Sequence, residues 1–321
     1  MGERAEARPR IVLTGATGFI GRHLQRELIA AGCDLAVVVR PRSAHRAAVH
    51  PAARVHDLEL DDHAGLCAAL READFAIYGA GAVRGRDATD FALANVTGVR
   101  CFAQAAVAAM AHPRVLLLSS LAASRPQLSN YAASKRAGEA ALAAQDGLAW
   151  TIVRPPAVYG PGDREMLPLF TAMRRGFAPR LGPPDQRLSL LHVTDLARAV
   201  RAMIECFAAC RAQIFDLDDG RPGGYGWDDL RALARRGRPA LVLPVPRALL
   251  GALAWTNLVL ARLFGYRPML SPGKVNELCE PRWLCNNQPL AAATGWRPQV
   301  ALREGVDSLF TPAGQKRSEN P

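Results

Sequence analysis

The chain has 321 residues, half of them apolar and about a fifth charged, so it can bury one large core or two linked ones and does not belong to the disordered class. Its net charge of +11 comes from arginines scattered among acidic residues rather than gathered with aromatic ones, which argues against general nucleic-acid binding. Seven cysteines without a C-x-x-C pair predict buried thiols in a reducing compartment, with neither disulfides nor a metal site.

The first half of the chain alternates short apolar runs, typical of buried parallel strands, with helix-like stretches. The predicted strands are 10–15, 34–40, 54–60, 74–81, 114–120, 148–155 and, later in the chain, 213–220. The predicted helices run from Phe19 to about Gly32, over 89–110 and over 130–145, and a strand with a following helix is expected within 188–205. This alternation predicts an α/β fold with a doubly wound parallel sheet of the Rossmann type.

The amino-acid composition changes after Pro155, where Pro, Gly and Arg become frequent and indicate loops that leave the sheet. We therefore expect a nucleotide-binding domain and a smaller, mostly helical C-terminal substrate-binding region. The first covers 1–160 and is completed by about 188–218. The second covers 161–187 and 219–311, and a polar tail follows over 312–321.

Neither the N-terminus nor any internal run has the pattern of a targeting or spanning segment. The first ten residues lack the apolar stretch of a secretory signal. The longest uncharged apolar run, 248–261, is shorter than the roughly 20 residues of a spanning helix. We expect a cytoplasmic protein without a transmembrane segment, in which 247–264 is a buried helix or, as the less favoured alternative, contacts a membrane surface or a partner.

A glycine-rich loop follows the first predicted strand and opens the first predicted helix. In "TGATGFIG" (14–21), one glycine permits a tight turn, another lets backbone amides approach a pyrophosphate, and the last lets helix pack on strand. The phosphate would sit at the helix N-terminus, where free N–H groups favour negative charge. The predicted dinucleotide-contacting residues of this loop are Gly15, Thr17, Gly18, Phe19, Ile20 and Gly21.

The end of the second predicted strand indicates which dinucleotide is bound. An NAD enzyme usually carries an acidic residue there for the ribose hydroxyls, but "RPRS" offers Arg40, Arg42 and Ser43. A guanidinium can hold a 2′-phosphate through two hydrogen bonds, and Arg22 adds charge nearby. We expect NADP(H) to be preferred, with NAD(H) possible.

A tyrosine and a lysine are placed for acid–base chemistry on the helix over 130–145. Tyr131 and Lys135 are four residues apart and therefore share a helix face, although such a pair alone also occurs by chance on surface helices. A nearby cation favours the phenolate and lowers the pKa of a tyrosine.

Together, these motifs resemble the extended branch of the short-chain dehydrogenase/reductase superfamily. That branch includes nucleotide-sugar epimerases and dehydratases, 3β-hydroxysteroid dehydrogenases and dihydroflavonol reductases. The resemblance covers nearly the whole chain. Its main anchors are "TGATGFIG" (14–21), "SS" (119–120), "YAASK" (131–135) and "RPPAVYGPGD" (154–163), with weaker ones at "DL" (57–58), "NVTG" (95–98), "HVTDLA" (192–197) and "TGW" (294–296).

The resemblance implies a role for each matching residue. Ser120 would hydrogen-bond the reacting oxygen, Tyr131 would transfer the proton, and Lys135 would bind the nicotinamide ribose and lower the pKa of the tyrosine. Ser119, the neighbouring serine, is expected to be structural. The further cofactor-binding residues implied are Arg40, Ser43, Asp57, Leu58, Gly79, Ala80, Gly81, Asn95, Pro155, Pro156 and Val158, and for Asn95 a structural role is an equal alternative.

The resemblance implies an NAD(P)-dependent oxidoreductase. The basic end of the second strand favours an NADP(H)-dependent enzyme that interconverts a ketone and a secondary alcohol. The apolar segments 166–170, 247–255 and 262–270 favour a lipophilic substrate, although a core would have the same composition. The alternatives are an NAD-dependent nucleotide-sugar epimerase or dehydratase, for which Arg187 lies one residue off the expected spacing, and a non-catalytic cofactor-binding protein. By resemblance, a homodimer formed through the helices at 89–110 and 130–145 is expected.

Overall fold

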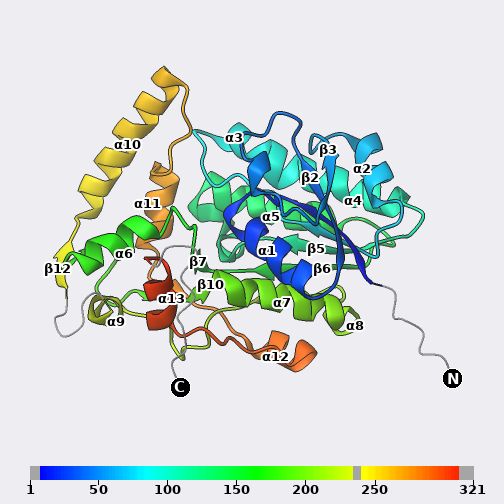
Figure 1. Cartoon of the computed structure of the whole chain (residues 1–321). Helices are drawn as coiled ribbons and strands as arrows, with labels where there is room; N and C mark the ends of the chain where they lie inside the picture. The colour runs from blue at the N-terminus through cyan, green and yellow to red at the C-terminus, as the bar shows by residue number, and fades with distance from the viewer. Residues whose placement is uncertain (1–7, 234–239, 311–321) are drawn as a thin grey trace.

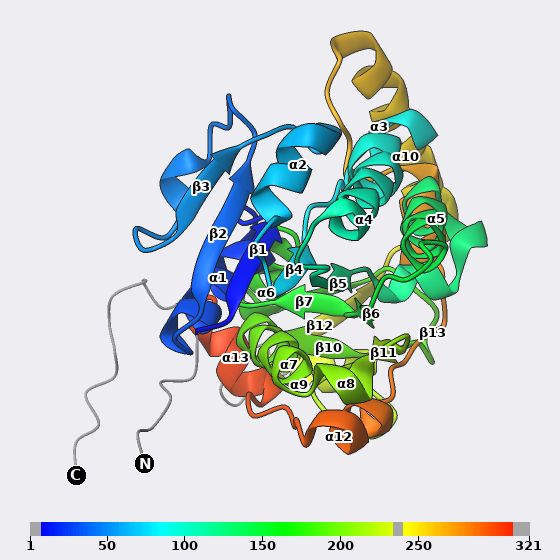
Figure 2. The same ribbon diagram turned by 90° about the vertical axis from the view of Figure 1, so that its right-hand side faces the viewer.

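The computed structural model describes residues 8–233 and 240–310. Its centre is a seven-stranded, entirely parallel sheet (Figures 1 and 2). In spatial order the strands are β11 (Ile214–Asp216), β6 (Trp150–Arg154), β5 (Arg114–Leu118), β4 (Phe75–Tyr78), β1 (Arg10–Thr14), β2 (Asp34–Val39) and β3 (Arg54–Asp57). The chain order reverses between β1 and β4, and this switch point is where doubly wound sheets bind nucleotides.

Helices cover both faces of the sheet, as Figure 2 shows. On one face lie α1 (Phe19–Ala30), α7 (Val193–Glu205) and α8 (Phe207–Cys210), and on the other α2 (His63–Leu70), α4 (Gly98–Ala108) and α5 (Asn130–Ala143). Short 3-10 helices occur at η1 (Arg46–Ala48), η3 (Leu121–Ser124) and η4 (Pro126–Leu128). The strands are apolar on both sides because both sides are covered. The predicted Rossmann-type fold is confirmed.

The elements of the remaining chain form three two-stranded sheets and a set of helices beside the carboxyl ends of the main strands. The parallel pairs are β7 (Ala157–Tyr159) with β10 (Leu190–His192), β8 (Phe177–Arg180) with β12 (Leu241–Pro244), and β9 (Arg187–Leu188) with β13 (Arg282–Trp283). The helices are α6 (Leu167–Arg174), α9 (Trp227–Ala232), α10 (Arg247–Phe264), α11 (Pro272–Cys279), α12 (Gln288–Thr294) and α13 (Leu302–Ser308). A second core joins α6, α9 and α13 around Tyr159 and Phe170.

Two sequence predictions differ from the structure. The strands end one to four residues earlier than predicted. The helix predicted over 89–110 is α3 (Ala88–Ala92), a π-helical turn η2 (Leu93–Thr97) and α4 in succession. Residues 288–296 pack on the main sheet through Leu290 and Trp296. The domain boundaries stay a prediction, and the polar tail lies outside the described residues.

Candidate functional site

The glycine loop between β1 and α1 lies against the end of β4. Gly15 has a φ of +70°, and a Cβ there would lie 2.4 Å from the carbonyl of Gly79. A Cβ on Gly21 would lie 2.2 Å from the carbonyl oxygen of Gly15, so α1 can pack this closely only with glycine. The hydroxyl of Thr14 accepts hydrogen bonds from the amides of Gly79 (3.1 Å) and Ala80 (3.2 Å) and fixes the two strand ends together.

The first turn of α1 is suited to an anion. Its N-cap is Gly18, no side chain in the described part of the chain caps it, and its first turn contains no acidic residue. Thr17, Phe19 and Ile20 stand on either side of this cap, and free amides there attract a phosphate. Arg22, one turn on, has a buried Nε without a hydrogen-bond partner among the described residues. These features fit the pyrophosphate of a dinucleotide.

The residues after β2 present positive charge. Arg40 and Arg42 are exposed and have no ion-pair partner within 8–233 and 240–310, and Ser43 follows them. Asp57, at the end of β3, is held by Arg46, whose Nη2 lies 3.0 Å from Oδ2, and this contact keeps the pKa of the Asp57 carboxyl below its usual range. Sequence reasoning did not single out Arg46, since only the fold brings η1 beside β3.

Ser120, Tyr131 and Lys135 come together beside the end of β4. Ser120 lies two residues after β5 and caps η3, and its hydroxyl forms a hydrogen bond with that of Tyr131. Lys135 is buried and donates from Nζ to the carbonyl of Leu118 at 3.1 Å. A Cβ on Gly81 would lie 3.2 Å from the same Nζ, so the glycine leaves room for the ammonium.

The electrostatics of Tyr131 differ from the expectation. Burial raises its pKa to about 12, the hydrogen bond with Ser120 lowers it, and the charge of Glu277 raises it, whereas Lys135 is not among the causes. Burial also lowers the pKa of Lys135 to about 8, against the opposing effect of Glu139. The Lys135 ammonium points to a backbone carbonyl, so the predicted lowering of the tyrosine pKa by this lysine is absent from this structure. Tyr131 is a neutral phenol, which is the form that donates a proton.

Of the remaining predicted cofactor residues, Asn95 lies beside Gly81 and Lys135. Asn95, in the π-helical turn, accepts from the amide of Ala82 (2.9 Å) and donates to its carbonyl (2.9 Å) and to the hydroxyl of Ser134 (2.9 Å). Both polar atoms of the Asn95 side chain therefore join the loop after β4 to α5. This arrangement corresponds to the structural role that was the alternative to cofactor binding for Asn95. The carbonyl of Pro155 accepts from the amide of Leu121 at 2.9 Å. Pro156 and Val158 lead into and along β7, and Leu58 follows β3.

A buried ion pair fixes α5 on the sheet. Glu139, two turns after Tyr131, accepts from Arg154 at 2.8 and 2.6 Å and from the hydroxyl of Ser119 at 2.5 Å. The side chains of Glu139 and Arg154 are only 3% and 11% exposed. Ser119 is thus engaged with Glu139, and Ser120 is the serine beside Tyr131.

Helix α11 supplies site residues that sequence reasoning missed. The carboxylate of Glu277 accepts from Ser129, which caps α5, and from Lys274 at 2.8 Å. The Lys274 ammonium lies 6.0 Å from the centre of the Tyr131 ring. Nothing in the sequence spacing linked this helix to Tyr131, because about 140 residues separate them.

A cavity of about 230 Å³ reaches Tyr131 from between α10, α11 and the loop before α3. Its wall includes the apolar residues Val83, Phe91, Leu258, Pro268 and Met269 and the charged residues Arg86, Arg262, Lys274 and Glu277. Walls that combine apolar residues with polar groups are typical of small-molecule sites. The cavity therefore offers space for an organic molecule beside the phenol.

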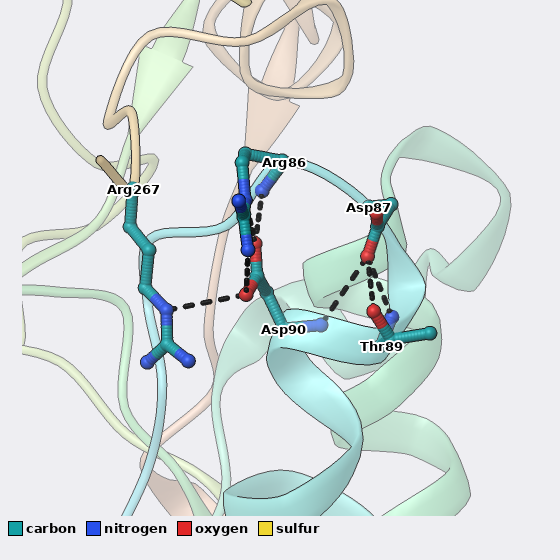
Figure 3. Close-up of polar contacts among 5 residues, drawn as sticks. All are labelled: Arg86, Asp87, Thr89, Asp90 and Arg267. Carbon is teal, nitrogen blue, oxygen red and sulfur yellow. Dashed lines mark hydrogen bonds and ion pairs between the residues drawn. The ribbon is translucent and has the colours of Figure 1, made fainter. Parts of the chain in front are cut away.

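The segment after α10 is attached to α3 through Asp90 (Figure 3). Asp90, whose side chain is 5% exposed, accepts from Nε of Arg86 at 2.9 Å and from Nε of Arg267 at 3.2 Å. Asp87 caps the same helix by accepting from the amide of Thr89 at 3.0 Å. This junction fixes the outer wall of the cavity to the nucleotide-binding part of the chain.

Comparisons with known proteins decide the family. Residues 11–215 match the NAD dependent epimerase/dehydratase family. The chain belongs to this family. It is thus an NAD(P)-dependent oxidoreductase of the extended short-chain dehydrogenase/reductase type, as the resemblance implied.

This family member has relatives of known activity and structure. It is 39% identical to a ceramide reductase of Caulobacter vibrioides, over 95% of this chain and 91% of the relative. It is 29% identical to a 2-alkyl-3-oxoalkanoate reductase of Stenotrophomonas maltophilia, over 56% of each. The structure of the UDP-glucose 4-epimerase of Thermus thermophilus in complex with NAD superposes with a TM-score of 0.67 at 20% identity, covering 93% of this chain and 97% of that one. This last likeness shows the fold.

Among the described residues of this oxidoreductase, no three His, Cys, Asp or Glu side chains come together as a metal site. All seven cysteines are free.

Proposed function

We propose that this enzyme is an NADP(H)-dependent reductase that converts a ketone on a lipophilic molecule to a secondary alcohol. The observation that carries the proposal is the position of Tyr131, hydrogen-bonded to Ser120, in the wall of the cavity. Tyr131 donates its proton to the carbonyl oxygen while Ser120 hydrogen-bonds that oxygen. The bound dinucleotide supplies the hydride. Lys135 holds the ribose, and its lowered pKa leaves it partly neutral near pH 8.

The lipophilic substrate is supported by the cavity and by the relatives. The cavity wall includes the apolar residues Val83, Phe91 and Leu258 beside its charged ones. Both curated relatives carry names of reductases, one acting on a ceramide and one on a 2-alkyl-3-oxoalkanoate. We infer a long-chain lipid with an oxo group as the substrate class.

The preference for NADP(H) is supported by Arg40 and Arg42, which stand free after β2 where an acidic residue would favour NAD(H). Arg46 is already paired with Asp57, so the two exposed guanidiniums are the ones available to a 2′-phosphate. Replacing Arg40 and Arg42 together by alanine is expected to weaken NADPH binding more than tenfold and to leave NADH binding nearly unchanged. Equal loss for both nucleotides would contradict the preference.

The nucleotide-sugar alternative is less well supported. Arg187, the candidate for a sugar diphosphate, forms an ion pair with Asp229 at 3.4 Å and does not line the cavity at Tyr131. An epimerase or dehydratase of this branch would also retain NAD tightly. Denaturing the purified protein and identifying the released nucleotide distinguishes the two: co-purifying NAD favours the epimerase or dehydratase, and exchangeable NADPH favours the reductase.

The variant Tyr131→Phe tests whether the protein is an enzyme of this kind. We expect it to lose ketone reduction by at least about a hundredfold, the typical contribution of general acid catalysis, and to bind NADPH as before. The readout is NADPH oxidation with oxo-lipids in detergent micelles, next to a fluorescence titration with NADPH. Unchanged turnover would refute the role of Tyr131. If cells that lack the protein show a phenotype and cells that carry Tyr131→Phe do not, a non-catalytic cofactor-binding protein would be favoured.

A cytoplasmic location and a homodimer through α4 and α5 remain part of this proposal. The outer face of α5 is rich in alanine, which permits close helix approach, and sedimentation of the purified protein tests the assembly.

A further inference from the structure

Helix α10 exposes an apolar face over most of its length. It has 18 residues, and only Leu250, Ala254 and Ala261 are buried. Leu249, Leu253, Leu260 and Leu263 follow one another at intervals of four, seven and three residues and are 51%, 51%, 41% and 73% exposed. Trp255 and Phe264 are 64% and 75% exposed. A face this apolar is unusual on a protein surface and marks an interaction site.

The exposed apolar surface continues beyond the helix. β12, which leads into α10, exposes Leu241 and Leu243 at 60% and 43%, and its partner β8 exposes Phe177 at 51%. Figure 1 shows α10 at the margin of the molecule, with β12 at its N-terminal end and the α3 side of the fold at its other end. The helix thus forms one edge of the protein, attached through a small apolar cluster of Leu250 and Ala254 with Val275 of α11.

The charges on this edge are of one sign. Residues 241–270 contain three arginines and no acidic residue. Arg247 bonds to the neutral Asn276, and Arg262 has no ion-pair partner within the described ranges. At about 3.6 residues per turn, Arg247 and Arg262 lie on the side of α10 opposite Leu249, Leu253 and Leu260, where Arg247 contacts α11 and Arg262 lines the cavity. An apolar helix face with basic and no acidic residues on the rest of the helix is suited to the surface of an anionic bilayer.

The length and attachments of α10 favour lying on a membrane over crossing it. Among described residues, α10 and the segment Ala88–Ala108 are apolar and long enough to be candidate spans, but Ala88–Ala108 packs into the core and core helices pass the same test. At about 1.5 Å per residue α10 is about 27 Å long, slightly less than a hydrocarbon core. Both of its ends return to the folded body, through β12 and through the contact of Arg267 with Asp90.

The cavity at Tyr131 opens beside this helix. Leu258 and Arg262 of α10 line it, so the outer wall of the reaction site is part of the apolar edge. At about 230 Å³ the cavity is smaller than the roughly 300–1,000 Å³ of sites that enclose drug-sized ligands. A lipid with long chains could place its oxo group at Tyr131 only with the chains outside, along α10.

We propose that α10 docks in the interface of an anionic phospholipid bilayer and that the lipid substrate passes from the bilayer past Leu258 and Arg262 to Tyr131. The docking is inferred from the exposed apolar face and the charges of α10 alone. The passage of substrate rests on the proposed reductase function.

Flotation with vesicles tests the docking. The full-length protein is mixed with vesicles of phosphatidylcholine alone or of phosphatidylcholine with phosphatidylglycerol. We expect binding to the anionic vesicles that weakens as salt is added, because salt screens the arginines. The double variant Leu253→Glu/Leu260→Glu should lose about tenfold in partition coefficient for each leucine, since burying a leucine contributes at least about 1.5 kcal/mol. Met110→Glu, at an 83% exposed position after α4, is the matched control and should bind normally.

Two activity assays separate the docking from the reductase function. With a short-chain ketone in solution, the double variant should equal the unaltered enzyme, because neither leucine lines the cavity. With a long-chain oxo-lipid in anionic vesicles, its rate should fall in proportion to its binding. Vesicle binding without reduction of any ketone would refute the reductase function and leave the docking. Absence of vesicle binding would overturn the docking, and so would a dimer that the double variant converts to a monomer, which would assign the face to a second copy.

Discussion

Replacing Glu139 by alanine tests how far the buried ion pair beneath α5 stabilises the fold. The change leaves the guanidinium of Arg154, 11% exposed, without its two hydrogen bonds to the carboxylate. Removing one partner of a buried pair costs about 3–5 kcal/mol. With an unfolding entropy of about 2.1 cal/mol/K per residue over 321 residues, the melting temperature should fall by about 4 to 7 °C.

Thermal unfolding followed by circular dichroism provides the measurement. Asp34→Asn is the matched control, because the pair of Asp34 with Arg54 is exposed (41% and 63%) and should contribute at most about 1 kcal/mol. The double variant Glu139→Leu/Arg154→Met should recover part of the loss, since it removes both charges of the pair, although Asp216 then loses the nearby cation. If Glu139→Ala lowers the melting temperature no more than the control does, the reasoning about this pair is wrong.

Three further predictions concern protonation and packing. Glu277→Gln should lower the pKa of Tyr131, because it removes a negative charge that raises this pKa, and the alkaline limb of the rate–pH profile should move to lower pH; an unmoved limb would contradict the assignment. Burial lowers the pKa of His192 to about 4, so the stability that the neutral ring contributes is complete above pH 6.5 and is lost as the pH falls towards 4. Between pH 7 and 5, His192 should lower the free energy of unfolding, measured with urea, by about 2 kcal/mol. His192→Asn, which can still cap α7, should remove this part of the pH dependence. Gly21→Ala should destabilise the protein and weaken NADPH binding, because the added Cβ meets a carbonyl at 2.2 Å. Gly251→Ala, with open space around the added Cβ, should instead raise the free energy of unfolding by about 0.5–1 kcal/mol. Equal effects of the two variants would refute the packing argument.

The sheet could be predicted from sequence because parallel strands buried on both faces are continuously apolar. The same property concealed the π-helical turn at 93–97, since apolar residues continue through it and no Pro or Gly marks the change of hydrogen bonding until Gly98. The turn is explained by its contacts: Asn95 must reach both Ala82 and Ser134.

The grouping of Ser120, Tyr131 and Lys135 could be predicted because their spacing along the chain is local. Tyr131 and Lys135 share one helix, and Ser120 lies two residues after β5. The residues that set the pKa of the tyrosine could not be found in this way. Glu277 reaches the site from a helix late in the chain, and only the tertiary fold brings its charge there.

The cavity beside Tyr131 draws its walls from parts of the chain that are synthesised far apart. Residues 83–91 and 129–131 supply one side and residues 258–277 the other. The parallel sheet is complete once β11 (Ile214–Asp216) has left the ribosome, and domains form from the N-terminus onward during synthesis. A growing chain can therefore assemble its nucleotide-binding sheet while the wall over the phenol is still missing. The substrate side of the enzyme is the last to be built, and a chain interrupted after β11 would carry Tyr131 uncovered.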